Sequence, residues 1–312
     1  MEAGSKGQKY DMLVVTGPTA SGKTALAAAL ADRLGGEVIS ADSRQVYRGM
    51  DLGTGKDYSD YIVNGRTIPC HLTDITEPGY KYSVYEYQRD FQEVYKYLKD
   101  NKIFPVVCGG SGMYIDSVVS GYRMLKVPAD NALRAELEQK DSEELTAILA
   151  SFKKLHNRSD LDTKMRMIRA IEIEKYHSMA EGSLPQFPEL NPLVAGILYD
   201  RDTRRERITL RLKERMDSGM VDEVRGLLER GIPAETLVYY GLEYKYITLH
   251  LTGRLTYEEM AGELETAIHR YSKRQMTWFR GMERRGIGIH WIDGTLPLET
   301  KIDLVLELLA RP

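Results

Sequence analysis

The feature that most constrains this chain is a glycine-rich stretch, residues 17–24, between an apolar run and a helical pattern. It reads GPTASGKT and fits G-x-x-x-x-G-K-[ST] at every position. The apolar run Met12–Thr16 predicts a strand, and Lys23–Leu34 predicts a helix. Glycines let backbone N–H groups curve around an anion, and the helix N-terminus adds partial positive charge. We therefore expect a phosphate-binding loop rather than a chance glycine turn, and the motif leaves open whether the ligand is ATP.

The side chains of this loop add to the expected site. Lys23 supplies a positive charge, and the Thr24 hydroxyl can ligate Mg²⁺ beside a bound phosphate. The predicted phosphate-binding residues are Gly17, Pro18, Thr19, Ala20, Ser21, Gly22, Lys23 and Thr24.

Strand and helix patterns alternate along the rest of the chain. Ser83 and Glu86 form a capping-box pattern that predicts a helix to about Lys99. Further strands are predicted over 37–40, 71–75, 104–108, 194–199 and 287–292, and further helices over 202–217, 221–229, 257–280 and 298–309. This alternation predicts an α/β fold with a parallel sheet covered by helices.

One stretch, residues 121–192, differs in texture. It is helical and charged, has almost no strand signal, and ends in a loop pattern rich in Gly and Pro over 182–192. We therefore expect a core domain of residues 1–122 and 193–312, with a helical insertion domain of residues 123–192 between two strands of the sheet.

Composition narrows the class of protein. The 312 residues are 42% hydrophobic and 29% charged, which suffices for a sizeable core and is unlike a disordered chain. Cys70 and Cys108 cannot form a disulfide framework, which favours a reducing compartment. The polar N-terminus lacks the apolar segment of a signal peptide, and no apolar run approaches the roughly 20 residues of a membrane span. We expect a soluble, cytoplasmic protein with no membrane partner.

A carboxylate follows the second predicted strand. Asp42 lies in the run Ser40–Ser43, and the carboxyl ends of parallel strands face the ligand crevice. Asp42 is a candidate general base or metal partner, and a loop aspartate that caps a turn is an equally good interpretation. The polar run Asp42–Lys56 suits substrate recognition, and the glycine turn of residues 109–112 allows a ligand close to the backbone.

Positive charge is concentrated in three stretches although the net charge is −3. Residues 153–175 and 201–215 each hold seven Lys or Arg, and residues 269–285 hold six. Such patches predict a polyanionic partner, with solvated helix faces as the alternative. Arg207 and Arg211 lie one helical turn apart and could clamp a diphosphate. The alternative is that they pair with Glu206 and Glu214.

Five motifs follow one another along residues 11–295. They are GPTASGKT, DSRQVYRGMDLGTGK (42–56), H-L-x-D-I (71–75), GGSGMY (109–114) and KRQMTWFR (273–280). This set resembles the bacterial tRNA dimethylallyltransferase family. The resemblance implies a P-loop-NTPase-like core with a helical insertion that embraces the anticodon stem-loop of tRNA. It also implies transfer of a dimethylallyl group from dimethylallyl diphosphate to N6 of adenosine 37 by a monomer, with Mg²⁺ as cofactor.

The resemblance implies roles for individual residues. Asp42 would be the general base, Thr24 would serve Mg²⁺ and the diphosphate, and Arg211 would bind the diphosphate. Met165–Arg169 corresponds to the family's Q-R-L-x-R stretch, and Ser111 stands where the family usually has threonine. The positions that the resemblance places against tRNA are Asp42, Ser43, Arg44, Gln45, Ser111, Arg134, Met165, Arg166, Met167, Ile168 and Arg169.

The chain departs from the family at Val238–Glu243. The family has a G-Y-[RK] motif here, preceded by a basic residue, and this chain lacks the cations of both positions. A different adenine acceptor therefore stays an alternative. So do a small-molecule P-loop kinase, a prenyltransferase of free adenylate, and an RNA-binding module without catalysis. The insertion and the basic stretches favour the tRNA enzyme over the kinase and the prenyltransferase of free adenylate. An enzyme is favoured over the non-catalytic RNA-binding module by the presence of Lys23, Thr24 and Asp42.

Overall fold

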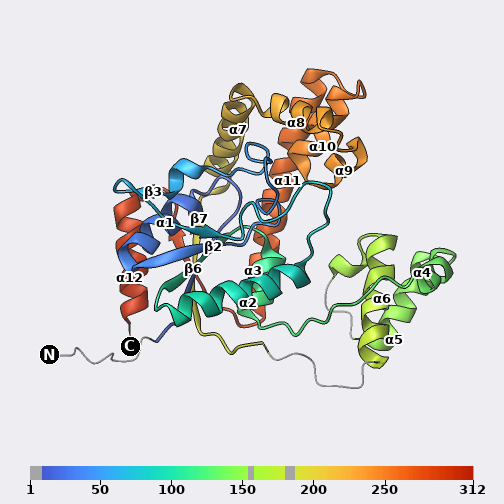
Figure 1. Cartoon of the computed structure of the whole chain (residues 1–312), viewed down its shortest axis with the longest axis horizontal. Helices are drawn as coiled ribbons and strands as arrows, with labels where there is room; N and C mark the ends of the chain where they lie inside the picture. Colours follow the sequence, from blue (N-terminus) through green and yellow to red (C-terminus); the bar gives the residue numbers. More distant parts are fainter. Residues whose placement is uncertain (1–8, 154–157, 180–186, 312) are drawn as a thin grey trace. The chain divides into compact units, whose positions relative to one another are not determined.

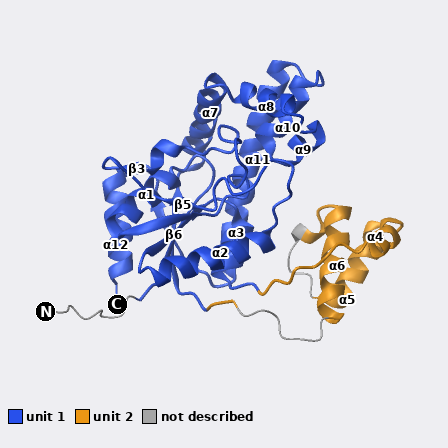
Figure 2. Ribbon diagram, viewed as in Figure 1, with its two compact units in different colours: residues 1–122, 189–312 blue, residues 123–188 orange. Residues whose placement is uncertain are grey.

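The computed structural model describes residues 9–153, 158–179 and 187–311. The polar N-terminal residues 1–8, four positions of the basic stretch 153–175 and residues 182–186 of the predicted loop 182–192 lie outside this part. The chain divides into two compact units, residues 1–122 with 189–312 (unit 1) and residues 123–188 (unit 2), as Figure 2 shows. Among the helices described, none is long and apolar enough to span a bilayer.

Unit 1 is built on a parallel six-stranded sheet in the order β5-β2-β6-β1-β7-β8 (Figure 1). All five residues of the central strand β1 are buried, as expected for a strand covered on both faces. The strands are β1 Met12–Thr16, β2 Gly36–Ser40, β5 Cys70–His71, β6 Phe104–Gly109, β7 Pro192–Leu198 and β8 Ile289–Asp293.

Helices cover both faces of this sheet. Leu13 and Val15 of β1 pack in one apolar cluster with α1 (Lys23–Leu34) and α12 (Leu298–Ala310). The helices α2 (Val84–Asp100) and α3 (Gly112–Val119) lie on the other face (Figure 1). The capping box at the start of α2 is confirmed, because Ser83 and Glu86 exchange both hydrogen bonds. The predicted α/β class with a helix-covered parallel sheet is confirmed.

Unit 1 is completed by a group of helices that lies between β7 and β8 along the chain. It comprises α7 Arg201–Asp217, α8 Met220–Glu229, α9 Ala234–Tyr239, α10 Leu242–Leu251 and α11 Tyr257–Arg284. The buried side chains of α11 include Met260, Leu264 and Ile268, which recur at the helical spacing of a core face. The short helices α3, α9 and α10 were not predicted by the sequence patterns, nor was the hairpin β3 Ile62–Val63 and β4 Arg66–Thr67.

The strand predicted over 71–75 is wrong for most of its length, because β5 ends at His71. Leu72 and Asp74 have φ of 62° and 56°, a left-handed conformation that a strand cannot contain. The segment instead bonds to the polar run after β2. The Asp74 amide donates to the Gln45 carbonyl over 3.1 Å, and the Ile75 amide donates to the Val46 carbonyl over 2.9 Å.

Unit 2 is a small helical body with its own apolar core. It contains α4 Asn131–Glu138, α5 Ser142–Phe152, the 3₁₀ turn η2 Arg158–Leu161 and α6 Lys164–Met179. Asp130 and Asp141 cap the first two helices by accepting from backbone amides one turn ahead. Leucines of α4 and α5 pack against Met167, Ile168 and Ile171 of α6.

Candidate active site at the carboxyl edge of the sheet

Three loops meet at the carboxyl ends of β1, β2 and β6. Thr16 lies opposite Gly109, and Ser40 lies opposite Cys108, so the segments that follow these strands begin at one edge. The loops approach so closely that a Cβ on Gly109 would lie 2.2 Å from the Ala41 carbonyl oxygen. Glycine at this position therefore lets the second glycine turn reach the Asp42 segment.

The glycine-rich loop joins β1 to α1 as predicted. Gly22 caps α1 in the left-handed conformation, with φ of 76°. Within the described residues, the buried Ser21 hydroxyl has no hydrogen-bond partner. Burial lowers the pKa of the Lys23 ammonium; Cys108 and Asp42 oppose this shift, and Arg211 adds to it. An anion in the loop would satisfy the hydroxyl and stabilise the charged lysine, so these atoms suit phosphate binding.

Gln275 of α11 ties the two glycine loops together. Its side-chain oxygen accepts from the Thr19 amide over 2.9 Å, and its side-chain nitrogen donates to the Gly110 carbonyl over 2.8 Å. Gln275 is only 6% exposed, so both bonds are shielded from water. The helix that carries the last motif thus sets the spacing of the candidate phosphate loop.

Asp42 is half-buried at the end of β2. Its interactions show whether it caps a turn, which the sequence left open. One carboxylate oxygen accepts from the Arg44 amide over 3.0 Å, so Asp42 does cap a turn. Its other oxygen, Oδ2, has no hydrogen bond among the residues that the structure describes, and remains available for a proton. The capping and catalytic interpretations therefore do not exclude each other.

The neighbours of Asp42 are held in place by polar contacts. The Ser43 amide donates to the Ser111 hydroxyl over 2.9 Å, which brings two predicted site residues together. Ser111 is the N-cap residue of α3 but does not cap that helix, since its hydroxyl serves Ser43 instead. Gln45 accepts from the Ser40 hydroxyl and donates to the Gly55 carbonyl, each over 3.1 Å.

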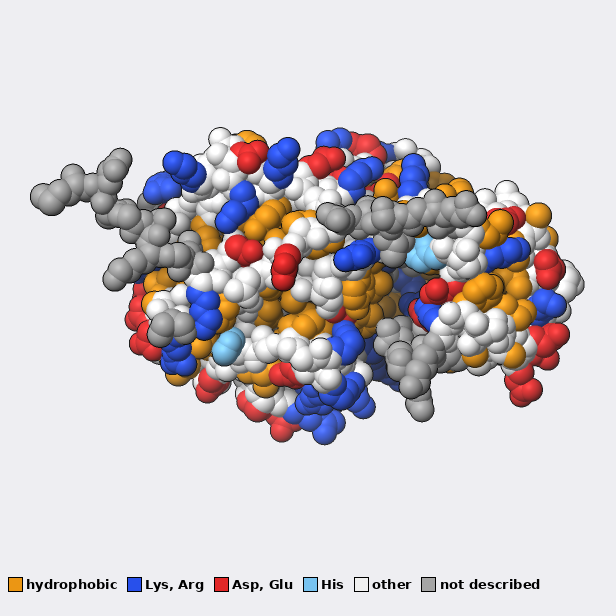
Figure 3. All heavy atoms as spheres, turned by 90° about the horizontal axis from the view of Figure 1, so that it is seen from below, with side chains coloured by type: hydrophobic (Ala, Val, Ile, Leu, Met, Phe, Trp, Pro, Cys, Tyr) orange, Lys and Arg blue, Asp and Glu red, His pale blue; other side chains and the backbone are white. Residues whose placement is uncertain are grey.

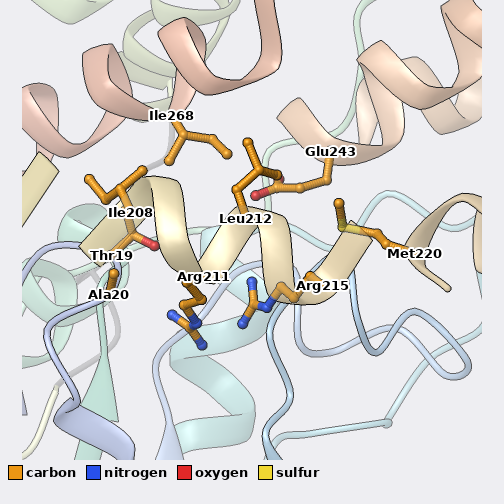
Figure 4. Close-up of a pocket in the computed structure, with 9 residues that line it drawn as sticks. All are labelled: Thr19, Ala20, Ile208, Arg211, Leu212, Arg215, Met220, Glu243 and Ile268. Atoms are coloured by element: carbon orange, nitrogen blue, oxygen red, sulfur yellow. The ribbon is translucent and has the colours of Figure 1, made fainter. Parts of the chain in front are cut away.

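Arginines of α7 lie next to the glycine-rich loop (Figure 4). Arg211 and Arg215 extend from the same side of the helix, and both pair with the Asp57 carboxylate. Arg207 donates to the Ala20 carbonyl of the glycine-rich loop over 3.0 Å. The alternative that Arg207 and Arg211 pair with Glu206 and Glu214 is wrong, because their partners come from other segments.

A pocket lies beside these arginines (Figure 4). Burial lowers the pKa of Arg215, and the neighbouring Arg211 adds to the shift. Burial also raises the pKa of Glu243, against the opposing charge of Arg215. The pocket thus combines cationic, acidic and apolar walls. Its lining residues are Thr19, Ala20, Ile208, Arg211, Leu212, Arg215, Met220, Glu243 and Ile268.

The remaining predicted residues lie in unit 2. Arg134 and Arg169 both bond to the buried carboxylate of Glu172, whereas among the described residues Arg166 pairs only with the exposed Asp162. Within Met165–Arg169, Met165 is 80% exposed, and Met167 and Ile168 are buried in the core of the unit. These side chains thus divide into exposed groups and groups that hold unit 2 together.

Three residues of the site were missed by sequence reasoning. Gln275 lies inside the motif of residues 273–280, but the motif gave this residue no role. Asp57 directly follows the motif of residues 42–56, and Arg215 lies one turn beyond Arg211. In no case did the sequence indicate which distant segment each side chain contacts. Among the described residues, no group of three or more His, Cys, Asp or Glu could hold a metal ion.

The chain matches known proteins over most of its length. The family model described as IPP transferase matches residues 45–282. The chain is 59% identical over 302 residues to tRNA dimethylallyltransferase 2 of Bacteroides fragilis, covering 97% of this chain and 99% of that one. It is 55% identical to tRNA dimethylallyltransferase 2 of Phocaeicola vulgatus, with coverage of 97% and 98%.

Solved structures show the same relationship. The tRNA isopentenylpyrophosphate transferase of Bacillus halodurans superposes with a TM-score of 0.70 at 32% identity, covering 96% of each chain. A eukaryotic dimethylallyltransferase acting on tRNA shares the fold at 19% identity, with a TM-score of 0.75 over 96% of this chain and 80% of that one. On the family model and the extent of identity, this chain belongs to the IPP transferase family.

Proposed function

We propose that this chain transfers a dimethylallyl group from dimethylallyl diphosphate to N6 of adenosine 37, beside the anticodon of tRNA. The observation that supports this most directly is that a phosphate loop and the Asp42 carboxylate lie at one edge of the sheet. Among the described residues, the Ser21 hydroxyl of the loop and Asp42 Oδ2 have no hydrogen-bond partner, and the half-buried Lys23 lies in the same loop. The names of the relatives support this reading over a kinase, a free-adenylate prenyltransferase and a non-catalytic module.

The departing diphosphate gains negative charge as the prenyl carbon–oxygen bond breaks. Backbone amides of residues 17–24, the Lys23 ammonium and the Arg211 guanidinium would stabilise that charge, which is usually the largest contribution to catalysis. Arg211 would then exchange or share its present partner, Asp57.

The attacking amine must lose a proton as the new carbon–nitrogen bond forms. Asp42 Oδ2 would accept it, while Oδ1 stays bonded to the Arg44 amide and holds the side chain in place. Adenosine 37 must leave its stack to reach this edge, which RNA loops permit at modest cost.

The residues present fit a Mg²⁺ ion held mainly by its substrate. Thr24 offers a hydroxyl, and Mg²⁺ commonly binds one or two protein oxygens together with phosphates. When bound there, the ion would neutralise charge on the diphosphate. A dedicated cluster of acidic ligands is not needed for this kind of binding.

We further propose that unit 2 and the basic stretches of unit 1 bind the anticodon stem-loop of tRNA. Figure 3 shows Lys and Arg side chains in separate groups among acidic and apolar ones on one face. Such local groups can contact successive phosphates of an RNA. The net charge of −3 supplies no overall positive field that would attract RNA in their place. A cytoplasmic monomer remains our expectation.

The proposal is tested by incubating the purified protein with dimethylallyl diphosphate and unmodified tRNA, then digesting the RNA for mass spectrometry. We expect a dimethylallyl mass increment on adenosine 37 that the Lys23→Ala variant fails to produce. Free AMP and ATP with small-molecule acceptors serve as comparison substrates. A wild-type protein that modifies AMP or transfers phosphate, and leaves tRNA unchanged, would contradict the proposal.

A further inference from the structure

An exposed tyrosine has two cations close to its ring near the candidate active site. Tyr239, the last residue of α9, is 46% exposed. The Arg44 guanidinium carbon lies 5.3 Å from the centre of its ring, and Lys81 Nζ lies 5.2 Å from it. Both distances are within the range of cation–π contacts.

The ion pairing of these two cations differs from that of a nearby arginine. Among the residues that the structure describes, neither Arg44 nor Lys81 forms an ion pair, whereas Arg48 nearby pairs with Glu77. A protein with more acidic than basic residues has thus left two positive charges uncompensated around one aromatic ring. This charge pattern is complementary to an anion that also offers a flat apolar surface.

The position of the tyrosine is set by its buried neighbour. Tyr240 is fully buried, accepts from the Gly79 amide, and donates to the Tyr80 carbonyl over 2.9 Å. Its ring centre lies 4.4 Å from that of Tyr47. The segments that carry Arg44, Lys81 and Tyr239 are therefore locked together, and the Tyr239 ring stays exposed beside the buried Tyr240.

The cluster adjoins the proposed catalytic carboxylate, because the Arg44 amide bonds to Asp42 Oδ1. It also occupies the segment in which the sequence lost two of its family's cations. Arg44 and Lys81, from segments distant in sequence, supply positive charge there.

We infer that Arg44, Tyr239 and Lys81 form a stacking site for one unpaired nucleobase of the acceptor RNA and its phosphates. Aromatic rings stack on bases of single-stranded RNA, and flanking cations bind the backbone. This inference rests on the proposed function, because it names how the acceptor loop is held next to Asp42. The site would favour a single-stranded loop over duplex RNA, since only an unpaired base exposes its flat face.

The test measures binding of an unmodified anticodon stem-loop RNA by fluorescence anisotropy, without dimethylallyl diphosphate. We expect Tyr239→Ala and Tyr239→Leu to weaken binding about 5- to 150-fold, the range for loss of one base–aromatic stack. Tyr239→Phe should bind within about twofold of wild type, because it keeps the ring. Lys81→Ala should reduce the slope of log K against log salt by about 0.7, or one phosphate contact on a single strand.

The matched control is Tyr257→Ala, because Tyr257 is 47% exposed and has no cation over its ring among the contacts described. It should bind as wild type does. Prenyl transfer by the wild-type protein is measured in parallel, so failure of the proposed function shows as absent product and failure of this site as unchanged affinities. The inference is overturned if Tyr239→Ala binds like Tyr257→Ala, if Tyr239→Phe is as weak as Tyr239→Ala, or if Lys81→Ala keeps the wild-type salt slope.

Discussion

Arg211 donates a hydrogen bond to the carboxylate of Asp57, 154 residues earlier in the chain. The contact joins α7 to the segment after the D-L-G-T-G-K motif, and Arg215 reaches the same carboxylate over 3.5 Å. A diphosphate bound by residues 17–24 would offer Arg211 a second anion. Arg211 is therefore placed to serve substrate through a partner exchange rather than through a pre-formed empty clamp.

Replacing Arg211 by Ala should raise the KM for dimethylallyl diphosphate. A hydrogen bond to a charged group contributes about 1.5–3 kcal/mol, which corresponds to about 10- to 150-fold. Lys23→Ala should be more severe, because the loop fixes that ammonium. Steady-state kinetics at saturating tRNA measures both, with Arg225→Ala as control, since Arg225 pairs with the exposed Asp222 on another helix. An Arg211→Ala variant with wild-type KM would make the arginine a structural partner of Asp57 only.

Asp42→Asn should keep the turn and remove the base. The amide oxygen can still accept from the Arg44 amide, so the loop geometry is retained. Loss of a general base typically lowers the rate about 10²- to 10⁴-fold. Single-turnover kinetics should show this loss while the tRNA affinity stays close to that of wild type. Near-normal chemistry would remove Asp42 from the mechanism.

Gln275→Leu should loosen the two glycine loops. The substitution keeps the side-chain volume and leaves the Thr19 amide and the Gly110 carbonyl without partners, which costs about 1–3 kcal/mol of the free energy of unfolding. The KM for dimethylallyl diphosphate should also rise, because the loop loses its spacing. Urea unfolding and kinetics measure the two effects, and Thr277→Val on the same helix is the control. Unchanged values of both would show that Gln275 does not set the loop.

Glu172→Gln should destabilise unit 2 in a pH-dependent way. Although burial opposes ionisation, hydrogen bonds from Arg134, the Asp130 amide and Arg169 lower the pKa of Glu172 to about 2. The carboxylate is therefore easier to ionise in the folded than in the unfolded state. Its stabilisation, on the order of 3 kcal/mol, is present above the unfolded pKa near 4.5 and is lost as the pH falls toward 2.

Far-UV circular dichroism of thermal unfolding, at several pH values, compares wild type with Glu172→Gln. The difference between them should shrink between pH 4.5 and 2. A difference that stays constant with pH would assign the effect to packing and not to the charge.

Arg166→Ala should weaken tRNA binding with little effect on folding. In the part of the chain that the structure describes, Arg166 pairs only with Asp162. Both side chains are more than half exposed, so this ion pair adds little stability. Its guanidinium is free to meet a phosphate, and the slope of log K against log salt should fall by about one contact, 0.7 to 0.9. Filter binding across a salt series measures this, and an unchanged slope and affinity would mean that Arg166 does not contact RNA.

Local patterns predicted the elements around the phosphate loop well, because their signals lie within a few residues. The strand Met12–Thr16, the helix Lys23–Leu34 and the Ser83 capping box are confirmed at the predicted positions. The strand over 71–75 failed, because Leu72 and Asp74 adopt positive φ to bond the loop after β2. The helices α9 and α10 escaped prediction, since each is short and they meet at Gly241.

The sequence by itself determined the fold class, the phosphate loop and the candidacy of Asp42, since each depends on residue types at fixed short spacings. The tertiary structure alone decided which side chains from distant segments contact one another around these features. It placed Gln275 between two glycine loops, gave Arg211 its partner Asp57, and set Tyr239 beside Arg44 and Lys81. These pairings join residues far apart in the chain, and their geometry follows from how the helices pack on the sheet, which no local pattern encodes.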